Sequence, residues 1–301
     1  MRACNIDPTK FEIVTFQHSE WDGMAKVNEK MQTKRLYSIK LKVRPIKVQF
    51  DFDACLEKIT SIEVKDIEYT DTNGGLLEVF LTDSHRGLDN NYDRLLGAIT
   101  ERSKAMQKVV IVYGSDEFHV DNVKNTTVNG TQLEPIDLNE AWEDSYGFYF
   151  NLIYKLIQMG KEVEVIYLPG NHDSTISFSV VKALERSLPQ AKYDVSMEQY
   201  KAMRWKGVGI GWTHGDKGRK QDYDRLFLKR YPWILGDAQC CEMHYGHVHQ
   251  ESAKDSYGNM IRSLPTATAQ SQWTIDSGYE SVQRFQLFEY DDYGVKAIYY
   301  V

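Results

Sequence analysis

Five short apolar segments between residues 76 and 249 each run into side chains that can bind a metal. LLEVFLT leads into Asp83-Ser84-His85, VVIVYG into Ser115-Asp116, VEVIYLP into Gly170-Asn171-His172-Asp173, GVGIGW into Thr213-His214-Gly215-Asp216, and EMHY into Gly246-His247-Val248-His249. Short, mostly apolar runs of this kind are typical of strands buried inside a sheet. Ligands of open α/β sheets bind at the carboxyl ends of the strands, so we expect the five turns to converge on one site.

The segments between these strands alternate between helical and strand patterns. Helices are predicted near residues 92–106, 138–160, 175–187 and 221–231, and strands at 109–114, 163–168, 207–212 and 242–246. Asn73-Gly74 predicts a hairpin that pairs residues 62–70 with 76–82, and a second hairpin is expected about Asp292 to Gly294. The alternation predicts a layered α/β fold, with mixed sheets because hairpins interrupt it.

The donor types and their spacing indicate a pair of neighbouring metal ions. Residues i and i+2 of an extended segment point to one side, so Asp83 with His85, and His247 with His249, can each aim two donors at one place. Carboxylate, imidazole and amide oxygen without thiolate suit divalent Mn, Fe or Zn. Three of the eight histidines lie outside the five endings and are interpreted as structural, namely His18, His119 and His244.

Composition limits the binding partners and the cellular location that we expect for the chain. Its 36 Lys and Arg against 43 Asp and Glu give a formal net charge of −7, which argues against a protein that coats nucleic acid non-specifically. No membrane-length apolar run and no signal-peptide pattern are found, so we expect no membrane partner and a cytoplasmic location with reduced cysteines. The sequence does not indicate an oligomeric state.

Residues 1–60 form a separate predicted extension before a catalytic domain at 61–301. The segment from Lys30 to Lys47 carries seven cations around a loosely alternating apolar set, which predicts one or two half-exposed strands. Its charge has two interpretations, a solvated strand face or a surface for the phosphate backbone of nucleic acid.

As an ordered set, the five endings resemble the calcineurin-like metallophosphoesterase superfamily, whose hallmark order is D-x-H, G-D, G-N-H-D, H and G-H-x-H. The motifs DSH, GSD, GNHD, THGD and GHVH cover about residues 78–250. More narrowly, GSDEFHVDN and the later IRSLPT are similar to a phage-borne branch labelled DNA-repair exonuclease, found in a bacterial or phage-infected cell. The resemblance implies a four-layer αββα sandwich with a two-metal site at the carboxyl-terminal edge of its strands.

The resemblance also implies roles for individual residues. The first metal would be held by Asp83, His85 and His249, the second by Asn171, His214 and His247, and Asp116 would bridge them. His172 would be the catalytic imidazole, and Asp173 would orient it. The chain departs from the family at Thr82, which replaces a glycine, and at the inserted Ser115, so Asp121 is an alternative bridge to the preferred Asp116.

The predicted reaction is hydrolysis of nucleic-acid phosphodiester bonds, as in a DNA nuclease or exonuclease. Two divalent ions, with Mn²⁺ preferred and Zn²⁺, Fe²⁺ or Mg²⁺ as alternatives, would activate a bridging hydroxide and clamp the phosphate. Cations after His214 are predicted substrate contacts, with the outward face of a helix as the competing interpretation: Lys217, Arg219 and Lys220. The alternative substrate is a small nucleotide such as a cyclic nucleotide. A non-catalytic scaffold is disfavoured by the complete ligand set.

Overall fold

The computed structural model describes residues 11–27, 30–45, 74–87, 92–114, 116–268 and 281–301. The distribution of contacts between residues divides the chain into two compact units, residues 1–49 and 50–301, which are described separately. The boundary expected near residue 60 lies outside the described residues, so the two-domain division stays a prediction.

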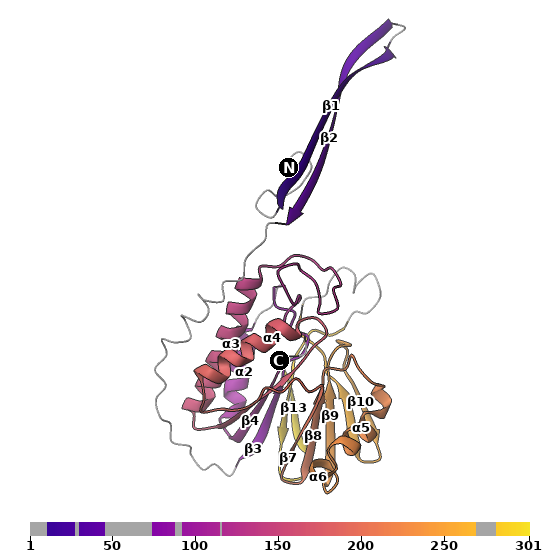
Figure 1. The fold of residues 1–301 in the computed structure, drawn as a ribbon. Helices are drawn as coiled ribbons and strands as arrows, with labels where there is room; N and C mark the ends of the chain where they lie inside the picture. Colours follow the sequence, from indigo (N-terminus) through magenta and orange to yellow (C-terminus); the bar gives the residue numbers. More distant parts are fainter. Residues whose placement is uncertain (1–10, 28–29, 46–73, 88–91, 115, 269–280) are drawn as a thin grey trace. The chain divides into compact units, whose positions relative to one another are not determined.

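The first unit is an antiparallel two-stranded ribbon (Figure 1). Its strands are β1 (Phe11–Val27) and β2 (Lys30–Pro45), and their register shifts once, between Ile13 and Thr15. The basic segment in which half-exposed strands were expected is therefore largely β2.

A six-stranded mixed sheet forms the centre of the second unit, counted over the described residues, in the order β13-β12-β3-β4-β5-β6. The strands are β3 (Gly75–Phe80), β4 (Met106–Gly114), β5 (Glu162–Leu168), β6 (Lys192–Asp194), β12 (Gln286–Tyr290) and β13 (Val295–Tyr300). The expected closing hairpin is β12 and β13. The expected pairing of residues 62–70 with 76–82 is wrong, because β3 has β4 on one side and β12 on the other.

The second sheet of this unit has five strands within the described residues, in the order β10-β11-β9-β8-β7. The strands are β7 (Tyr200–Trp205), β8 (Val208–Thr213), β9 (Cys240–Tyr245), β10 (Ser252–Ser256) and β11 (Asn259–Ser263). Strands β8, β9 and β11 are parallel, whereas β7 and β10 pair antiparallel to their neighbours. Cys240 and Cys241 are free thiols, while Cys4 and Cys55 lie outside the described residues.

Helices cover the outer face of each sheet, as the packing of the cores shows (Figure 1). The helices are α2 (Asp93–Ser103), α3 (Leu138–Gln158), α4 (Ser174–Ser187), α5 (Tyr223–Arg230) and α6 (Pro232–Leu235). Alternation along β4 sends Val109 and Ile111 toward α2, α3 and α4, and Val110 and Val112 toward the other sheet. The predicted αββα order is therefore confirmed. No described helix combines the length and apolarity needed to cross a membrane.

A buried polar network joins the two sheets. The carboxylate of Glu78 on β3 accepts hydrogen bonds from Trp212 Nε1 at 2.7 Å and Tyr290 OH at 2.6 Å, and lies 2.7 Å from His244 Nδ1. The other ring nitrogen of His244 lies 3.3 Å from Glu242, which also pairs with Arg262. Burial by itself would lower the pKa of His244, but the two carboxylates outweigh it and raise the pKa to about 9.

This shift predicts a pH dependence of stability. The pKa of His244 rises from 6.5 to about 9 on folding, so its stabilisation is fully present below pH 6.5 and is lost as the pH passes through about 9. We expect the free energy of unfolding in urea to fall between these pH values by on the order of 3 kcal/mol more than in His244→Gln. An equal fall of the unfolding free energy with pH in the two proteins would contradict a charged His244 between the carboxylates of Glu78 and Glu242.

Candidate metal centre

The metal-type side chains leave their strands through turns with left-handed backbone. Positive φ angles occur at Asp83 (55°), His85 (44°), Asp116 (62°), His247 (67°) and His249 (55°). Such angles are uncommon outside glycine and concentrate at functional sites. The expectation that Asp83 and His85 converge because the chain is extended is wrong. Asp83 and His85 have left-handed backbone on either side of Ser84, and this conformation turns both of their side chains toward the same place.

One group of donors lies after β3 and β9. The nearest donor atoms of Asp83, His85 and His249 all lie within 4.8 Å of one another. His249 Nε2 is 3.2 Å from Asp83 Oδ1 and 3.4 Å from His85 Nε2. Asp83 is fully buried, and its Oδ1 faces the His249 ring, whereas its Oδ2 accepts a hydrogen bond from the backbone N–H of His247 at 2.8 Å. The structure thus brings together the three residues predicted for the first metal.

A second group lies after β4, β5, β8 and β9. Donor atoms of Asp116, His214 and His247 also fall within 4.8 Å of one another. His214 Nε2 is 3.2 Å from Asp116 Oδ2 and 2.8 Å from the amide oxygen of Asn171. The residues predicted for the second metal, together with the predicted bridge Asp116, therefore surround one small volume.

The charges at the centre favour ionised carboxylates. Burial would raise the pKa of Asp116, but His214 and His172 outweigh it and lower the pKa to about 2. The same opposition, with His249 as the main partner, holds the pKa of Asp83 well below its usual range. Burial together with His172 and His249 lowers the pKa of His85 to about 3, so its ring is neutral. Anionic carboxylates and the neutral ring of His85 are in the protonation states that metal binding requires. The same carboxylates raise the pKa of His214 to about 9 and also raise that of His249, so a bound metal would have to displace a proton from each of these two rings.

These residues fit a pair of divalent cations. Two buried carboxylates lie among imidazoles and one amide oxygen. Buried charges are paired with opposite charge or coordinate metal ions. The absence of thiolate from the set suits Mn, Fe or Zn. The expected ligand chemistry therefore agrees with the geometry.

His172 lies beside both groups and is oriented by a residue that the sequence did not indicate. Its Nδ1 lies 3.0 Å from the carbonyl oxygen of His119, and its Nε2 lies 3.9 Å from Asp116 Oδ2. The ring of His119 joins His85 and His172 in a third cluster of donor atoms. His119 was interpreted as structural, although its place three residues after Asp116 was a usable signal.

Asp173 does not orient His172 in the structure. Its carboxylate is fully buried and accepts a hydrogen bond from the backbone N–H of Phe118 at 2.8 Å. Burial and the nearby Asp116 raise its pKa well above the usual range. The orienting role expected of Asp173 therefore belongs to the carbonyl of His119, and Asp173 supports the loop after β4.

Backbone hydrogen bonds hold the loops after β3 and β4 together. His85 N–H donates to Asp116 O at 3.1 Å, and Arg86 N–H donates to Glu117 O at 2.7 Å. The buried Arg86 side chain also pairs with Glu117.

Asp121, the alternative bridge, accepts hydrogen bonds from the first backbone N–H groups of α4, at Thr175 and Ile176. Of the two candidate carboxylates, Asp116 therefore lies among the metal-type donors, with His214 and His247, while Asp121 lies at the start of α4.

The chain near residue 266 fixes the position of Asp83. The hydroxyls of Thr266 and Thr268 both donate to the carbonyl oxygen of Asp83, the first at 2.8 Å. Thr82, the departure from the family pattern, donates to Asp83 Oδ2 at 2.5 Å. Sequence reasoning noted IRSLPT, which ends at Thr266, only as part of a resemblance. Its contact with Asp83 required the fold.

The three cations predicted as substrate contacts differ in their positions. Lys217 and Arg219 are exposed, and Lys217 lies 3.9 Å from the neighbouring Asp216. Lys220 is half-buried, and its ammonium lies 5.4 Å from the centre of the Tyr245 ring. Burial lowers the pKa of Lys220, and the charge of Asp83 opposes that shift. Lys220 is therefore within electrostatic range of the metal centre.

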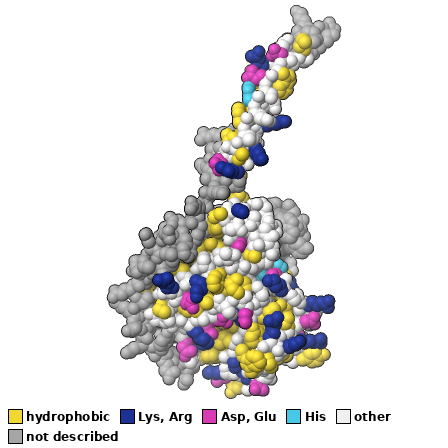
Figure 2. Space-filling model, viewed as in Figure 1, with side chains coloured by type: hydrophobic (Ala, Val, Ile, Leu, Met, Phe, Trp, Pro, Cys, Tyr) yellow, Lys and Arg dark blue, Asp and Glu magenta, His cyan; other side chains and the backbone are white. Residues whose placement is uncertain are grey.

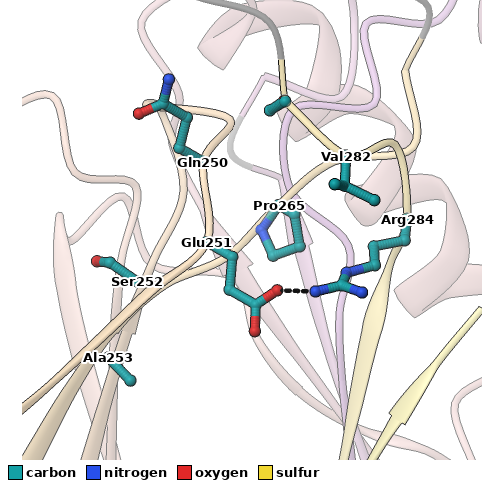
Figure 3. A pocket seen from close by; sticks show the side chains of 8 residues that line it. Gln250, Glu251, Ser252, Ala253, Pro265, Val282 and Arg284 are labelled. Atoms are coloured by element: carbon teal, nitrogen blue, oxygen red, sulfur yellow. Dashed lines mark hydrogen bonds and ion pairs between the residues drawn. The ribbon is translucent and has the colours of Figure 1, made fainter.

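A pocket of about 580 Å³ begins one residue beyond His249. Its lining comes from two separate stretches, Gln250 to Ala253 and the residues Ser281, Val282 and Arg284, together with Pro265. Figure 3 shows the Glu251 carboxylate and the Arg284 guanidinium joined as an ion pair in this pocket. Its volume is within the range of small-molecule sites.

Comparisons with known proteins show a distant likeness of fold. No protein-family model and no curated protein matches the chain. A single mutant of Vps29 from Entamoeba histolytica has 14% identity and a TM-score of 0.37, over 75% of this chain and 98% of that chain. A predicted phosphoesterase from Streptococcus pneumoniae TIGR4 has 14% identity and a TM-score of 0.32, over 76% and 99%. Vps29 from Entamoeba histolytica complexed with Zn²⁺ has 11% identity and a TM-score of 0.37, over 75% and 97%.

Proposed function

We propose that this chain is a metal-dependent phosphodiesterase that hydrolyses nucleic-acid phosphodiester bonds. The observation that carries the proposal is the pair of adjacent donor groups, Asp83 with His85 and His249, and Asp116 with His214 and His247. Carboxylates, imidazoles and the Asn171 amide are the ligand types of two-metal phosphoesterase sites. The full set disfavours a non-catalytic scaffold, which has no use for two complete clusters.

His172 is the group in the chain best placed to move a proton during the reaction. The carbonyl of His119 can only accept a hydrogen bond, so His172 Nδ1 carries hydrogen and Nε2 is the nitrogen that gains or loses a proton. When bound, two divalent ions would supply activation of water and neutralise phosphate charge. An imidazolium at His172 would then donate from Nε2 to the leaving oxygen.

Two substrate classes are favoured by different features. Lys220 beside the centre suits the continuous negative charge of a nucleic acid, as the resemblance to DNA-repair exonucleases also suggests. The pocket that begins after His249 favours the second candidate, a small nucleotide phosphoester. The nuclease is the first choice, with Mn²⁺ as the proposed metal and the cytoplasm as the proposed location.

The test is manganese-dependent release of nucleotides from end-labelled linear DNA, single- and double-stranded. Asp116→Asn, purified in the same way, controls for contaminating nuclease. Release by the wild-type protein alone is the expected result. Hydrolysis of bis-p-nitrophenyl phosphate without any cleavage of DNA would refute the nuclease and support the small-nucleotide alternative.

Replacement of His172 separates proton transfer from metal binding. We expect His172→Ala to lower kcat by about 100- to 10,000-fold while the number of bound metal ions stays the same, because the ring donates a proton and is absent from both predicted ligand sets. Turnover on bis-p-nitrophenyl phosphate and metal content by mass spectrometry are the readouts. Unchanged turnover would refute the catalytic role of His172.

The position of Lys220 predicts a role in substrate binding. Lys220→Gln should raise KM for a DNA substrate about tenfold, because it removes a charged donor near the centre. Lys217→Gln is the matched control, since Lys217 has the same charge but is exposed and lies beside Asp216, which argues against the substrate contact predicted for it. It should change KM less than twofold, and an equal effect of the two substitutions would contradict a specific contact at Lys220.

A further inference from the structure

The register of the β1–β2 ribbon separates its side chains into two chemically different faces. Residues paired directly across an antiparallel ribbon lie on the same face, and the face alternates along each strand. One face, named here the basic face, contains Lys34, Leu36, Ser38, Lys40, Lys42 and Arg44 of β2 opposite Gly23, Trp21, Ser19, Gln17, Thr15 and Glu12 of β1. Apart from the Trp21–Leu36 pair, this face is polar.

The opposite face, named the apolar face, contains a cluster of aliphatic and aromatic side chains together with the imidazole of His18. It consists of Ile13, Phe16, His18, Tyr37, Ile39, Leu41 and Val43, followed toward the loop by Glu20, Asp22 and Arg35. The ring of His18 stacks between those of Phe16 and Tyr37, with centroids 6.4 and 6.0 Å away. Asp22 and Arg35 form an ion pair at 3.4 Å. Four of the five cations of β2 after Lys30 therefore lie on the basic face, and the fifth, Arg35, is paired with Asp22 on the apolar face.

Solvation alone does not account for the composition of the basic face. It holds four cations and one acid, although the chain has a formal net charge of −7. A face built only for solubility mixes both signs. Lys34, Lys40 and Lys42 are exposed and form no ion pair with a described residue, and Lys or Arg side chains are visible along the ribbon in Figure 2. The excess of unpaired positive charge indicates an anionic ligand.

Geometry and an exposed aromatic ring make the ligand a nucleic acid. Lys40 and Lys42 are two residues apart on a strand, about 7 Å, which is about twice the rise between phosphates of one DNA strand. Trp21 is 49% exposed on the same face, where a base can stack on its ring. We propose that the basic face binds the sugar-phosphate backbone of nucleic acid and that β1–β2 is a substrate-binding arm. This inference rests on the proposed nuclease function.

A lipid surface fits the ribbon less well. An amphipathic element at a membrane buries its apolar face and keeps charge at the headgroups. Here Glu20 and Asp22 lie on the apolar face, so insertion would bury two carboxylates, while Trp21 would stay outside on the basic face. The distribution of charge therefore favours a nucleic acid over a membrane.

The test measures binding of the whole 301-residue chain to labelled single- and double-stranded DNA by fluorescence anisotropy in EDTA, which prevents cleavage. For Lys34→Gln/Lys40→Gln/Lys42→Gln we expect Kd to rise on the order of 10- to 100-fold and the salt dependence of binding to weaken by about two to three counterions. Lys104→Gln/Lys155→Gln/Lys182→Gln removes the same charge from exposed positions of the second unit and should change Kd less than threefold. Arg35→Gln, on the opposite face of β2, should also bind as wild type does.

The outcomes separate the arm from the catalytic proposal. Equal losses of DNA binding in the two triple variants, or in Arg35→Gln and Lys40→Gln, would overturn the basic face as a specific surface. Binding of phosphatidylserine vesicles but not DNA would overturn it in favour of a membrane. Hydrolysis of bis-p-nitrophenyl phosphate should be the same in both triple variants. If that hydrolysis is missing from the wild type while the ribbon still binds DNA, the phosphodiesterase proposal fails and the arm stands.

Discussion

Asp116→Asn should reduce phosphodiesterase turnover about 1000-fold with little loss of folding stability. The substitution keeps the size of the side chain but removes the negative charge that lies 3.2 Å from His214 Nε2. The other carboxylate oxygen of Asp116, Oδ1, accepts a hydrogen bond from the backbone N–H of His172 at 2.8 Å, so the same carboxylate also positions the GNHD turn. Loss of several kcal/mol of transition-state stabilisation by the metals corresponds to about this factor.

Asp121→Asn is the matched control for this substitution. Asp121 has the same chemistry five residues further on, but it binds backbone N–H groups at the start of α4. We expect its turnover to stay within about threefold of wild type, with a loss of stability of about 1 kcal/mol from the weakened helix cap. The reverse ranking of the two variants on bis-p-nitrophenyl phosphate would make Asp121 the bridging carboxylate.

Glu78→Ala should lower the free energy of unfolding by about 3 to 5 kcal/mol. The substitution removes the acceptor of Trp212 Nε1 and Tyr290 OH and one of the two carboxylates beside His244. All of these side chains are buried between the two sheets, so water cannot replace the lost carboxylate. Urea unfolding followed by circular dichroism gives the free energy.

Two further variants show whether the network or the strand is responsible. Glu162→Ala removes a carboxylate from the exposed start of β5 and should cost less than about 0.5 kcal/mol. Glu78→Gln keeps an acceptor for Trp212 but loses the charge beside His244, so its cost should lie between the other two. A cost for Glu78→Ala close to that of Glu162→Ala would contradict the stabilising role of the network.

Local patterns predicted the elements near the site well. The buried strands β4 and β5 are mostly apolar, and α3 has a clear helical period, so each was recognisable alone. The pairing of β3 was not, because its neighbour β12 lies more than 200 residues further along the chain. A favourable turn at Asn73-Gly74 predicted a local hairpin, but β12 and β4 occupy the two edges of β3.

The convergence of ligands was predicted for a partly incorrect reason. The residue types and strand endings were sufficient to select Asp83, His85 and Asp116, yet their left-handed backbone could not be read from the sequence. Contacts made by backbone carbonyls were also invisible, including that of the His119 carbonyl with the His172 ring and that of the Asp83 carbonyl with the Thr266 hydroxyl. Such contacts depend on the packing of loops that are distant in sequence.

The central claim is that two divalent ions occupy the two donor groups. Anomalous diffraction from crystals of the protein grown with Mn²⁺ tests it most directly, because manganese scatters anomalously and the protein's lighter atoms do so only weakly. We predict two strong peaks, one among Asp83, His85 and His249 and one beside Asp116, His214 and His247. Absence of a peak from either group, in crystals that retain this fold and an excess of Mn²⁺, would contradict the two-metal centre.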